Sequence, residues 1–161
     1  MMRNFERYQE LARNVVGQKL QSVNGLIYVY DAPDLGSPQQ LQLVFCDTYQ
    51  NIVCRCGLDG ASLELIDSPM QEKDLGEYGK EVIMDLSNSY LFQKAFGKIL
   101  LKFYVICSEI EQQIIGVKLV FDEGFKLVII NLGDEIKVFN SLLREYERDE
   151  KINYIDVLSV S

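Results

Sequence analysis

Two segments of this sequence occur twice in the same order, and this repetition constrains the fold more than any other feature. The segment Gly17-Gln-Lys-Leu20 returns as Gly97-Lys-Ile-Leu100. The segment Leu41-Gln-Leu-Val-Phe45 returns as Val117-Lys-Leu-Val-Phe121. The residue numbers shift by 80 in the first pair and by 76 in the second. A repeat of this period indicates two copies of one structural unit, so we predict a duplicated architecture.

Each copy has the pattern of one helix followed by about five strands. In the first copy we expect a helix at 3–16 and strands at 19–30, 40–47, 51–57, 62–66 and 82–86. In the second copy we expect a helix at 90–96, strands at 98–107, 116–122, 125–131, 135–139 and 153–157, and a charged helix at 141–150. The pattern predicts an antiparallel-rich α+β fold with two tandem, closely packed repeats, residues 1–86 and 87–161, related by a pseudo-two-fold axis.

The charge of the chain is strongly acidic and evenly spread. Its 161 residues include 24 acidic and 16 basic side chains and no histidine, for a formal charge of -8. Divided after Lys80, the first half has eleven acidic and seven basic residues and the second has thirteen and nine, so each carries a net -4. Such a surface repels nucleic acid and anionic lipid and attracts basic proteins. We expect a protein partner rather than nucleic acid or a membrane.

The sequence also bears on the cellular compartment. No apolar run approaches the roughly 18 residues that a membrane-spanning helix needs. The segment from Met1 to Gln18 is amphipathic and contains Glu6 and Glu10, which the apolar segment of a signal peptide would lack. We expect a cytoplasmic protein.

The four cysteines do not form a metal-binding pattern. Cys54 and Cys56 are two residues apart in a predicted strand, so their thiols share one face. A C-x-C pair cannot fold around zinc as C-x-x-C does, and the chain has no histidine to complete a site. We expect buried, reduced cysteines and no metal.

No motif for catalysis or cofactor binding is present. A nucleophilic serine or cysteine usually needs a histidine base, and no glycine-rich phosphate loop opens a helix. The remaining chemistry would use carboxylates alone, at Asp122-Glu123 or Asp134-Glu135, with Asp47 and Asp59 near the corresponding places of the first copy. We interpret these as solvated turn residues, and expect neither enzymatic activity nor a cofactor. A carboxylate-based, metal-dependent enzyme stays open as an alternative.

A protein interface is the function that the charge pattern favours. Two acidic segments, 67–81 and 144–156, occupy equivalent places between the fourth and fifth predicted strands of the copies, and Tyr49 and Phe125 lie in hairpin turns. Exposed tyrosines surrounded by carboxylates suit a basic partner, because the ring anchors the contact and the charges accelerate encounter. The candidate partner-binding residues are Asp67, Glu72, Asp74, Glu77, Tyr78, Asp122, Glu123, Phe125, Asp134, Glu135, Glu145, Tyr146, Glu147, Asp149 and Glu150.

In size, acidity, absence of histidine and strand-rich build, the chain resembles the small acidic immunity proteins that bacteria make beside a toxin, notably those of contact-dependent growth inhibition systems. This resemblance implies a heterodimer in which the chain masks the active site or substrate groove of a basic nuclease toxin. Its carboxylates would then stand in for nucleic-acid phosphates. A non-catalytic scaffold domain that forms a homodimer is the second hypothesis.

Overall fold

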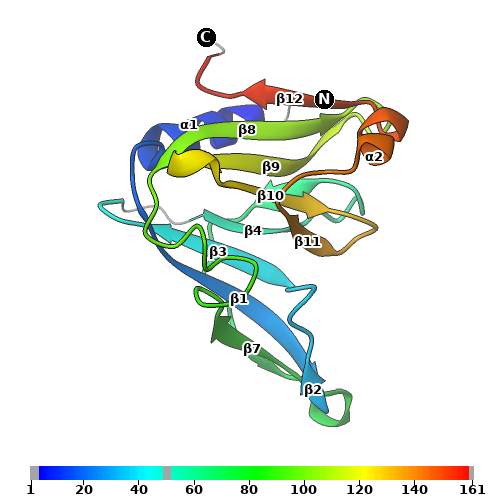
Figure 1. The fold of residues 1–161 in the computed structure, drawn as a ribbon. Helices are drawn as coiled ribbons and strands as arrows, with labels where there is room; N and C mark the ends of the chain where they lie inside the picture. Colours follow the sequence, from blue (N-terminus) through cyan, green and yellow to red (C-terminus); the bar gives the residue numbers. More distant parts are fainter. Residues whose placement is uncertain (1–3, 49–51, 160–161) are drawn as a thin grey trace.

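Two antiparallel β-sheets pack against each other and enclose one main core, with a helix beside them (Figure 1). The computed structural model describes residues 4–48 and 52–159. Tyr49, expected in a hairpin turn, lies outside these residues. In the described part of the chain, no helix has the length and apolar character needed to cross a membrane.

The first sheet has the strand order β5-β4-β3-β1-β7-β6, and β2 pairs with β1 beside this path. Helix α1 precedes it, and the short 3₁₀ turn η1 lies between its last two strands. The elements are α1 (Phe5–Val15), β1 (Leu20–Tyr30), β2 (Ala32–Pro33), β3 (Gln40–Phe45), β4 (Ile52–Cys56), β5 (Leu63–Leu65), β6 (Lys73–Asp74), η1 (Gly76–Tyr78) and β7 (Lys80–Asp85).

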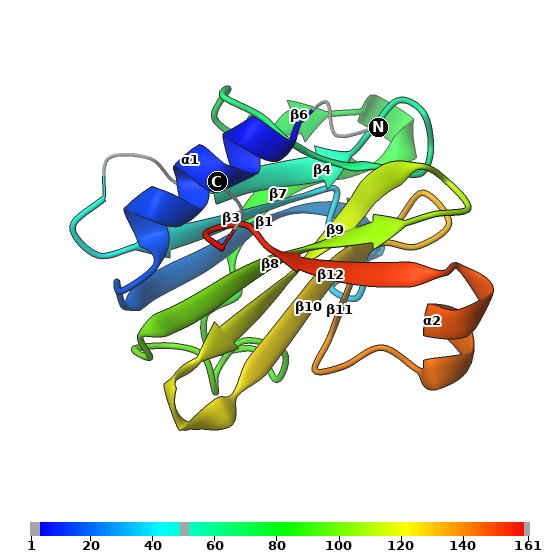
Figure 2. The ribbon, with the colours of Figure 1, turned by 90° about the horizontal axis from the view of Figure 1, so that it is seen from above.

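The second sheet has the strand order β11-β10-β9-β8-β12. A 3₁₀ turn, η2, joins two of its strands, and a short helix, α2, precedes the last one. The elements are β8 (Leu100–Ser108), β9 (Gln113–Phe121), η2 (Asp122–Gly124), β10 (Lys126–Asn131), β11 (Ile136–Phe139), α2 (Arg144–Asp149) and β12 (Ile152–Asp156). Figure 2 shows the two sheets from above, with α1 on one side and α2 on the other.

The prediction of two tandem helix-plus-five-strand repeats is wrong. The described residues are mainly strand and contain two α-helices, α1 and α2, which do not occupy equivalent places. The predicted helix at 90–96 is a series of turns, in which Ala95 N–H bonds to the Phe92 carbonyl and Lys98 N–H to the Ala95 carbonyl. Phe92 and Ala95 are buried. These two residues are three positions apart, as on one face of a helix, but here they anchor a short turn segment to the core.

The repeated sequence nevertheless has a structural counterpart where the two sheets meet. Residues 17–20 run beside residues 97–100 through an antiparallel bridge between Lys19 and Ile99. Four backbone hydrogen bonds of 2.7–3.0 Å join the two segments. Each bond has a symmetric counterpart, in which donor and acceptor are the residues at the equivalent positions of the opposite segment, 80 residues away. The four bonds run from Gly17 N–H to Leu100 O, Gly97 N–H to Leu20 O, Leu20 N–H to Lys98 O and Leu100 N–H to Gln18 O. The repeated segment therefore joins the two sheets.

Helix α1 closes one side of the core with its apolar stripe. Tyr8, Leu11, Ala12 and Val15 are buried, as the helical spacing of these residues predicts. Gly17 follows with a φ of +92°, a backbone conformation that favours glycine. The chain can thus leave the helix and enter the bridge between the sheets.

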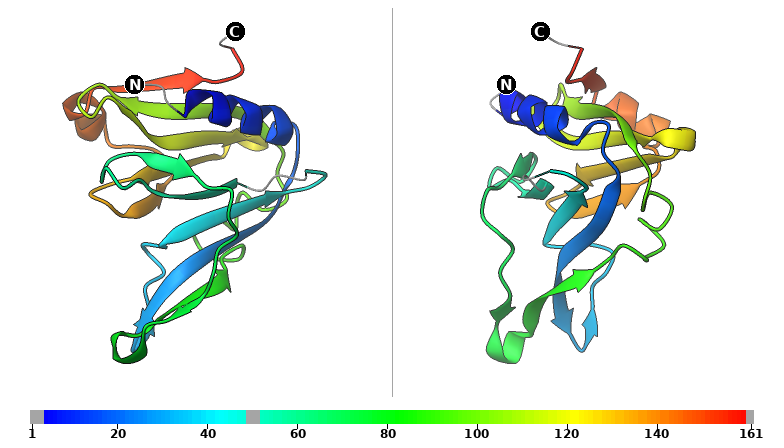
Figure 3. Two further views of the ribbon diagram at one scale, coloured as in Figure 1. Left: turned by 180° about the vertical axis from the view of Figure 1, so that it is seen from behind. Right: turned by 90° about the vertical axis from the view of Figure 1, so that its left-hand side faces the viewer.

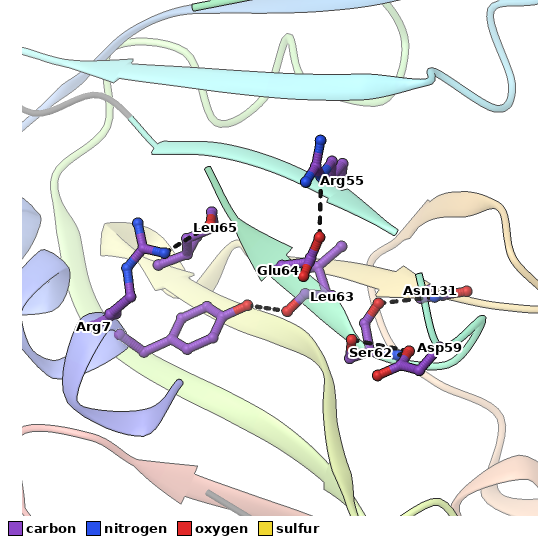
Figure 4. A network of polar contacts seen from close by, with 9 residues as sticks. Arg7, Arg55, Asp59, Ser62, Leu63, Glu64, Leu65 and Asn131 are labelled. Atoms are coloured by element: carbon purple, nitrogen blue, oxygen red, sulfur yellow. Dashed lines mark hydrogen bonds and ion pairs between the residues drawn. The ribbon is translucent and has the colours of Figure 1, made fainter. Parts of the chain in front are cut away.

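Side chains of α1 also cap the edge strand β5 (Figure 4). The Tyr8 hydroxyl donates to the Leu63 carbonyl at 2.5 Å, and the Arg7 guanidinium donates to the Leu65 carbonyl at 3.1 Å. An uncapped edge strand is a template for pairing with other chains. These two bonds satisfy carbonyl groups of β5 that have no neighbouring strand.

Replacing Tyr8 with phenylalanine is expected to lower the free energy of unfolding by about 1–3 kcal/mol, because the buried Leu63 carbonyl loses its donor. Urea denaturation followed by circular dichroism measures this change. The control is Tyr90→Phe, which removes the same hydroxyl from a side chain that is 83% exposed. Equal stabilities of the two variants would contradict the structural role of the Tyr8 bond.

The four cysteines are free thiols. Cys54 and Cys107 are buried and Cys46 and Cys56 are half-buried, so the prediction of buried thiols is met in full by two of them. Burial raises the pKa of the Cys54 thiol to about 12. No three His, Cys, Asp or Glu side chains among the described residues form a group that could hold a metal ion.

Candidate functional site

A ribbon of strands projects from the body of the protein. β1 and β7 extend past the packed part of the sheets and carry β2, β6 and η1 (Figures 1 and 3). We call residues 28–35 and 71–85 the arm. β7 pairs antiparallel with β6 over two residue pairs and with β1 over six, four of which join it to residues 24–27 in the body of the protein.

The tip of the arm is held by specific local contacts. The Asp74 carboxylate accepts the Gly76 N–H at 2.8 Å, and the Tyr28 hydroxyl donates to the Tyr78 carbonyl. Gly79 has a φ of +100°, and a Cβ atom there would lie 2.4 Å from the Val29 carbonyl oxygen. Only glycine allows β1 and the tip to approach this closely. The backbone of Tyr78 is therefore fixed while its ring points into solvent.

Replacing Gly79 with alanine is expected to cost about 1–3 kcal/mol locally, because it combines backbone strain with a steric clash. Since the clash involves the tip alone, we expect faster amide hydrogen exchange in η1 and β6 while the core keeps its protection. Gly124→Ala is the control, because it has a φ of +76° but no atom within 4 Å of the added Cβ. If both variants exchange alike, the close approach at Val29 has no role.

Large apolar side chains are exposed on the arm. The exposed fractions are 69% for Tyr78 and 57% for Tyr30, and Leu75 and Ile83 are near 40%. Tyr78 is a predicted anchor. Sequence reasoning missed Tyr30, Leu75 and Ile83, although the alternation of Tyr28 and Tyr30 at the end of a strand is visible in the sequence. Leu35, 47% exposed, was missed as well, so the arm offers five exposed apolar groups, two of them aromatic.

The same arm carries most of the net charge of the chain. It contains seven carboxylates and two lysines, a net -5 of the total -8. None of these seven carboxylates lies within 4.0 Å of a cationic group among the described residues. Glu72 accepts the Ile83 N–H at 2.8 Å, which covers the edge of β7, and Glu77 is exposed at the tip. The charge is unneutralised and available to a partner.

A segment that we call the strap, residues 66–70, crosses the outer face of the first sheet and leads into the arm. Ile66 and Met70 pack there against Leu26 and Val53 in a small separate cluster. The predicted residue Asp67 lies at the start of the strap and forms an ion pair with Arg7 at 2.6 Å. Asp67 therefore anchors the strap to α1 and is not part of the arm.

An acidic groove of about 500 Å³ runs between the strap and the turn from β10 to β11. Among its lining residues are Lys73 and Glu81 of the arm and the predicted residues Asp134 and Glu135. Burial, followed by the charges of these last two carboxylates, raises the pKa of the Cys56 thiol in the groove to about 11. The fold thus brings Asp134 and Glu135, distant in sequence, to the base of the arm.

The acidic residues of α2 lie at the opposite end of the molecule from the arm (Figures 1 and 3). The Tyr154 hydroxyl donates to Glu147 at 2.5 Å, and the Ser108 hydroxyl donates to Glu150 at 3.0 Å. Tyr146 packs against the outer face of the second sheet and is half-buried. Glu145 and Asp149 are exposed. Helix α2 is a cover for that sheet, and its predicted residues do not join the arm.

The third predicted group, at the turn η2, also stands apart. Glu123 forms an ion pair with Lys98 at 2.5 Å, and one carboxylate oxygen of Asp122 is buried. Phe125 is half-buried and its ring centroid lies 6.4 Å from that of Phe121. The Glu123–Lys98 ion pair and the contact between Phe125 and Phe121 hold the hairpin of β9 and β10 in place. Of the predicted residues, Glu72, Asp74, Glu77 and Tyr78 therefore lie on the arm, and Asp134 and Glu135 line the groove at its base.

No family model, no curated protein sequence and no solved structure matches this chain. The fold and the site define the class in structural terms alone: a two-sheet β protein with a projecting acidic arm.

Proposed function

We propose that this protein is an inhibitor-type binding protein that captures a basic protein, as an immunity protein neutralises a basic nuclease toxin. The observation that carries the proposal is the arm, which combines the exposed Tyr78 ring with seven carboxylates free of ion pairs. Unpaired charge of one sign accelerates encounter with a cationic surface. An exposed aromatic side chain on a fixed backbone supplies an anchor at low entropic cost.

The shape of the arm favours a concave target. A narrow ribbon enters a groove more readily than a flat sheet does, and the substrate groove of a nuclease is concave and basic because it accepts a phosphate backbone. Carboxylates along the arm would take the positions of phosphates. The acidic groove beside Asp134 and Glu135 adjoins the base of the arm and extends the negative surface. We place the protein in the cytoplasm, where it would meet an incoming toxin.

The test is a binding measurement with the purified product of the neighbouring gene. If that product is basic, we expect a one-to-one complex by light scattering and an affinity that falls as sodium chloride rises, because exposed charges are screened. Loss of the partner's nuclease activity on complex formation would support active-site masking. No association with a basic neighbour would refute the proposal.

A matched pair of variants locates the binding surface. The arm variant Asp34→Asn with Glu77→Gln and the control variant Glu145→Gln with Asp149→Asn each remove two exposed carboxylates. We expect the arm variant to slow association at low salt by about tenfold and the control to change it by less than about twofold. Equal effects would show that general acidity, and not the arm, attracts the partner.

A further inference from the structure

The outer edge of β12 has unused backbone hydrogen-bonding groups. On its inner side, Glu109 N–H donates to the Lys151 carbonyl and Val157 N–H donates to the Phe103 carbonyl, both at 3.2 Å. Because bonded residues alternate along an antiparallel strand, the odd-numbered residues of β12 face β8. The backbone groups of Ile152 and Tyr154 consequently face away from the sheet.

No partner for these groups is found among the residues that the structure describes. The backbone N–H and C=O groups of Ile152 and Tyr154 form no hydrogen bond there, and no strand lies beyond β12 (Figures 1 and 2). The strand is rich in β-branched and aromatic residues, which favour strand pairing, and has no proline. It is an open edge of the second sheet.

Two strands of the first sheet are protected at the corresponding place, whereas β11, the other edge of the second sheet, has no strand beyond it within the described ranges. β7 occupies in the first sheet the position of β12 in the second, because each pairs with the first strand of its sheet. The edge of β7 is covered by β6, an antiparallel strand, and by the Glu72 carboxylate on the Ile83 N–H. β5 is capped by Tyr8 and Arg7. Proteins usually protect such edges, so the open edge of β12 can accept a strand from outside the chain.

We propose that β12 pairs antiparallel with β12 of a second copy of this chain, forming a two-fold dimer centred on Tyr154. In this register Tyr154 faces its own counterpart and Ile152 faces Asp156, so all of Ile152–Asp156 is paired. The Lys151 end of each strand meets the Asp156 end of the other, which is electrostatically favourable, whereas parallel pairing would bring like charges together. The five-stranded sheet of one copy then continues into the five-stranded sheet of the other.

The dimer is independent of the capture of a basic partner, because β12 and the arm lie at opposite ends of the molecule (Figure 3). An edge contact along one short strand belongs to the small class of interfaces, below about 1,200 Å² of buried surface. We therefore expect a dimer at high protein concentration that dissociates on about 100-fold dilution, as mass action requires. Light scattering of the wild-type chain across this range measures the equilibrium. A monomer at every concentration would overturn the proposal.

Cysteine cross-linking tests the register. Residues directly opposite in a hydrogen-bonded pair have Cα atoms about 5.5 Å apart, within the range of roughly 4.4–6.8 Å that a disulfide spans. We expect Tyr154→Cys to form a covalent dimer on oxidation. Asn153→Cys is the control, because the two copies of residue 153 would be roughly 8 Å apart from strand geometry. The wild-type chain, with its four native thiols, shows the background.

Amide hydrogen exchange tests the same edge without substitution, which matters because Tyr154→Cys also removes the hydroxyl bound to Glu147. The N–H groups of Ile152 and Tyr154 should exchange more slowly at high protein concentration than after dilution. A dimer without this protection and without the Tyr154→Cys cross-link would use another surface and overturn the proposal. Protection that arises only when the basic partner is added would assign the edge to that partner, and would also overturn it.

Discussion

Replacing Tyr78 with alanine is expected to weaken binding of the basic partner about 30-fold or more, which corresponds to ~2 kcal/mol. The Tyr78 ring is 69% exposed in the free protein, while Gly79 and Tyr28 hold its backbone in place. Binding would bury the ring without first having to order the loop. Isothermal titration calorimetry with the purified neighbouring-gene product measures the change, which should lie mainly in the dissociation rate.

The matched control for this substitution is Tyr90→Ala. Tyr90 is 83% exposed and lies in the turn segment after β7, outside the arm, so its loss should change affinity by less than about twofold. Circular dichroism should show both variants folded, since neither ring is part of the core. Equal affinities of the Tyr78 and Tyr90 variants would remove Tyr78 as the anchor, even if the acidic arm still affected the association rate.

Replacing Phe103 with alanine is expected to lower the free energy of unfolding by about 3–5 kcal/mol, the usual cost of truncating a buried phenylalanine. Phe103 is fully buried on β8, and its ring centroid lies 6.3 Å from that of Tyr8 on α1. The substitution opens a cavity where the helix meets the second sheet. Chemical denaturation followed by far-ultraviolet circular dichroism measures the loss, which is a large part of the stability of a typical domain.

Lys102→Ala provides the control for Phe103→Ala, because Lys102 is the exposed neighbour on the same strand. Its removal should change stability by no more than about 0.5 kcal/mol. A small effect of Phe103→Ala would mean that α1 does not pack on β8 as the contact with Tyr8 indicates.

Strand positions could be predicted from the sequence because alternation of apolar residues is a local signal. The expected strand at 40–47 is observed as Gln40–Phe45, and the expected charged helix at 141–150 is observed as Arg144–Asp149. The helix expected at 90–96 failed for a physical reason. Phe92 and Ala95 have helical spacing, but they are two anchors of a short turn segment between β7 and β8.

The arm could be predicted only in part because it depends on pairing between distant residues. The sequence marks the acidic segment 67–81, yet the division of this segment into a strap and an arm tip depends on the pairing of β7 with β1, in which Ile83 lies opposite Leu26. The placement of Asp134 and Glu135 beside the arm has the same origin. Local sequence also could not show that Glu147 and Glu150 are already bonded to Tyr154 and Ser108.

The return of β7 to β1, and of β12 to β8, has a consequence for the speed of folding. In each sheet, one edge of the first strand has no partner until the last long strand of that sheet has been added. The pairs that close these edges, such as Leu26 with Ile83 and Val105 with Ile155, join residues far apart in the sequence. Closing such long loops costs entropy before any contact compensates for it. Chains dominated by distant pairings fold in milliseconds to seconds rather than microseconds. During that interval β1 and β8 each expose an unpaired strand edge. Refolding from denaturant should therefore lose more protein to aggregation as protein concentration rises.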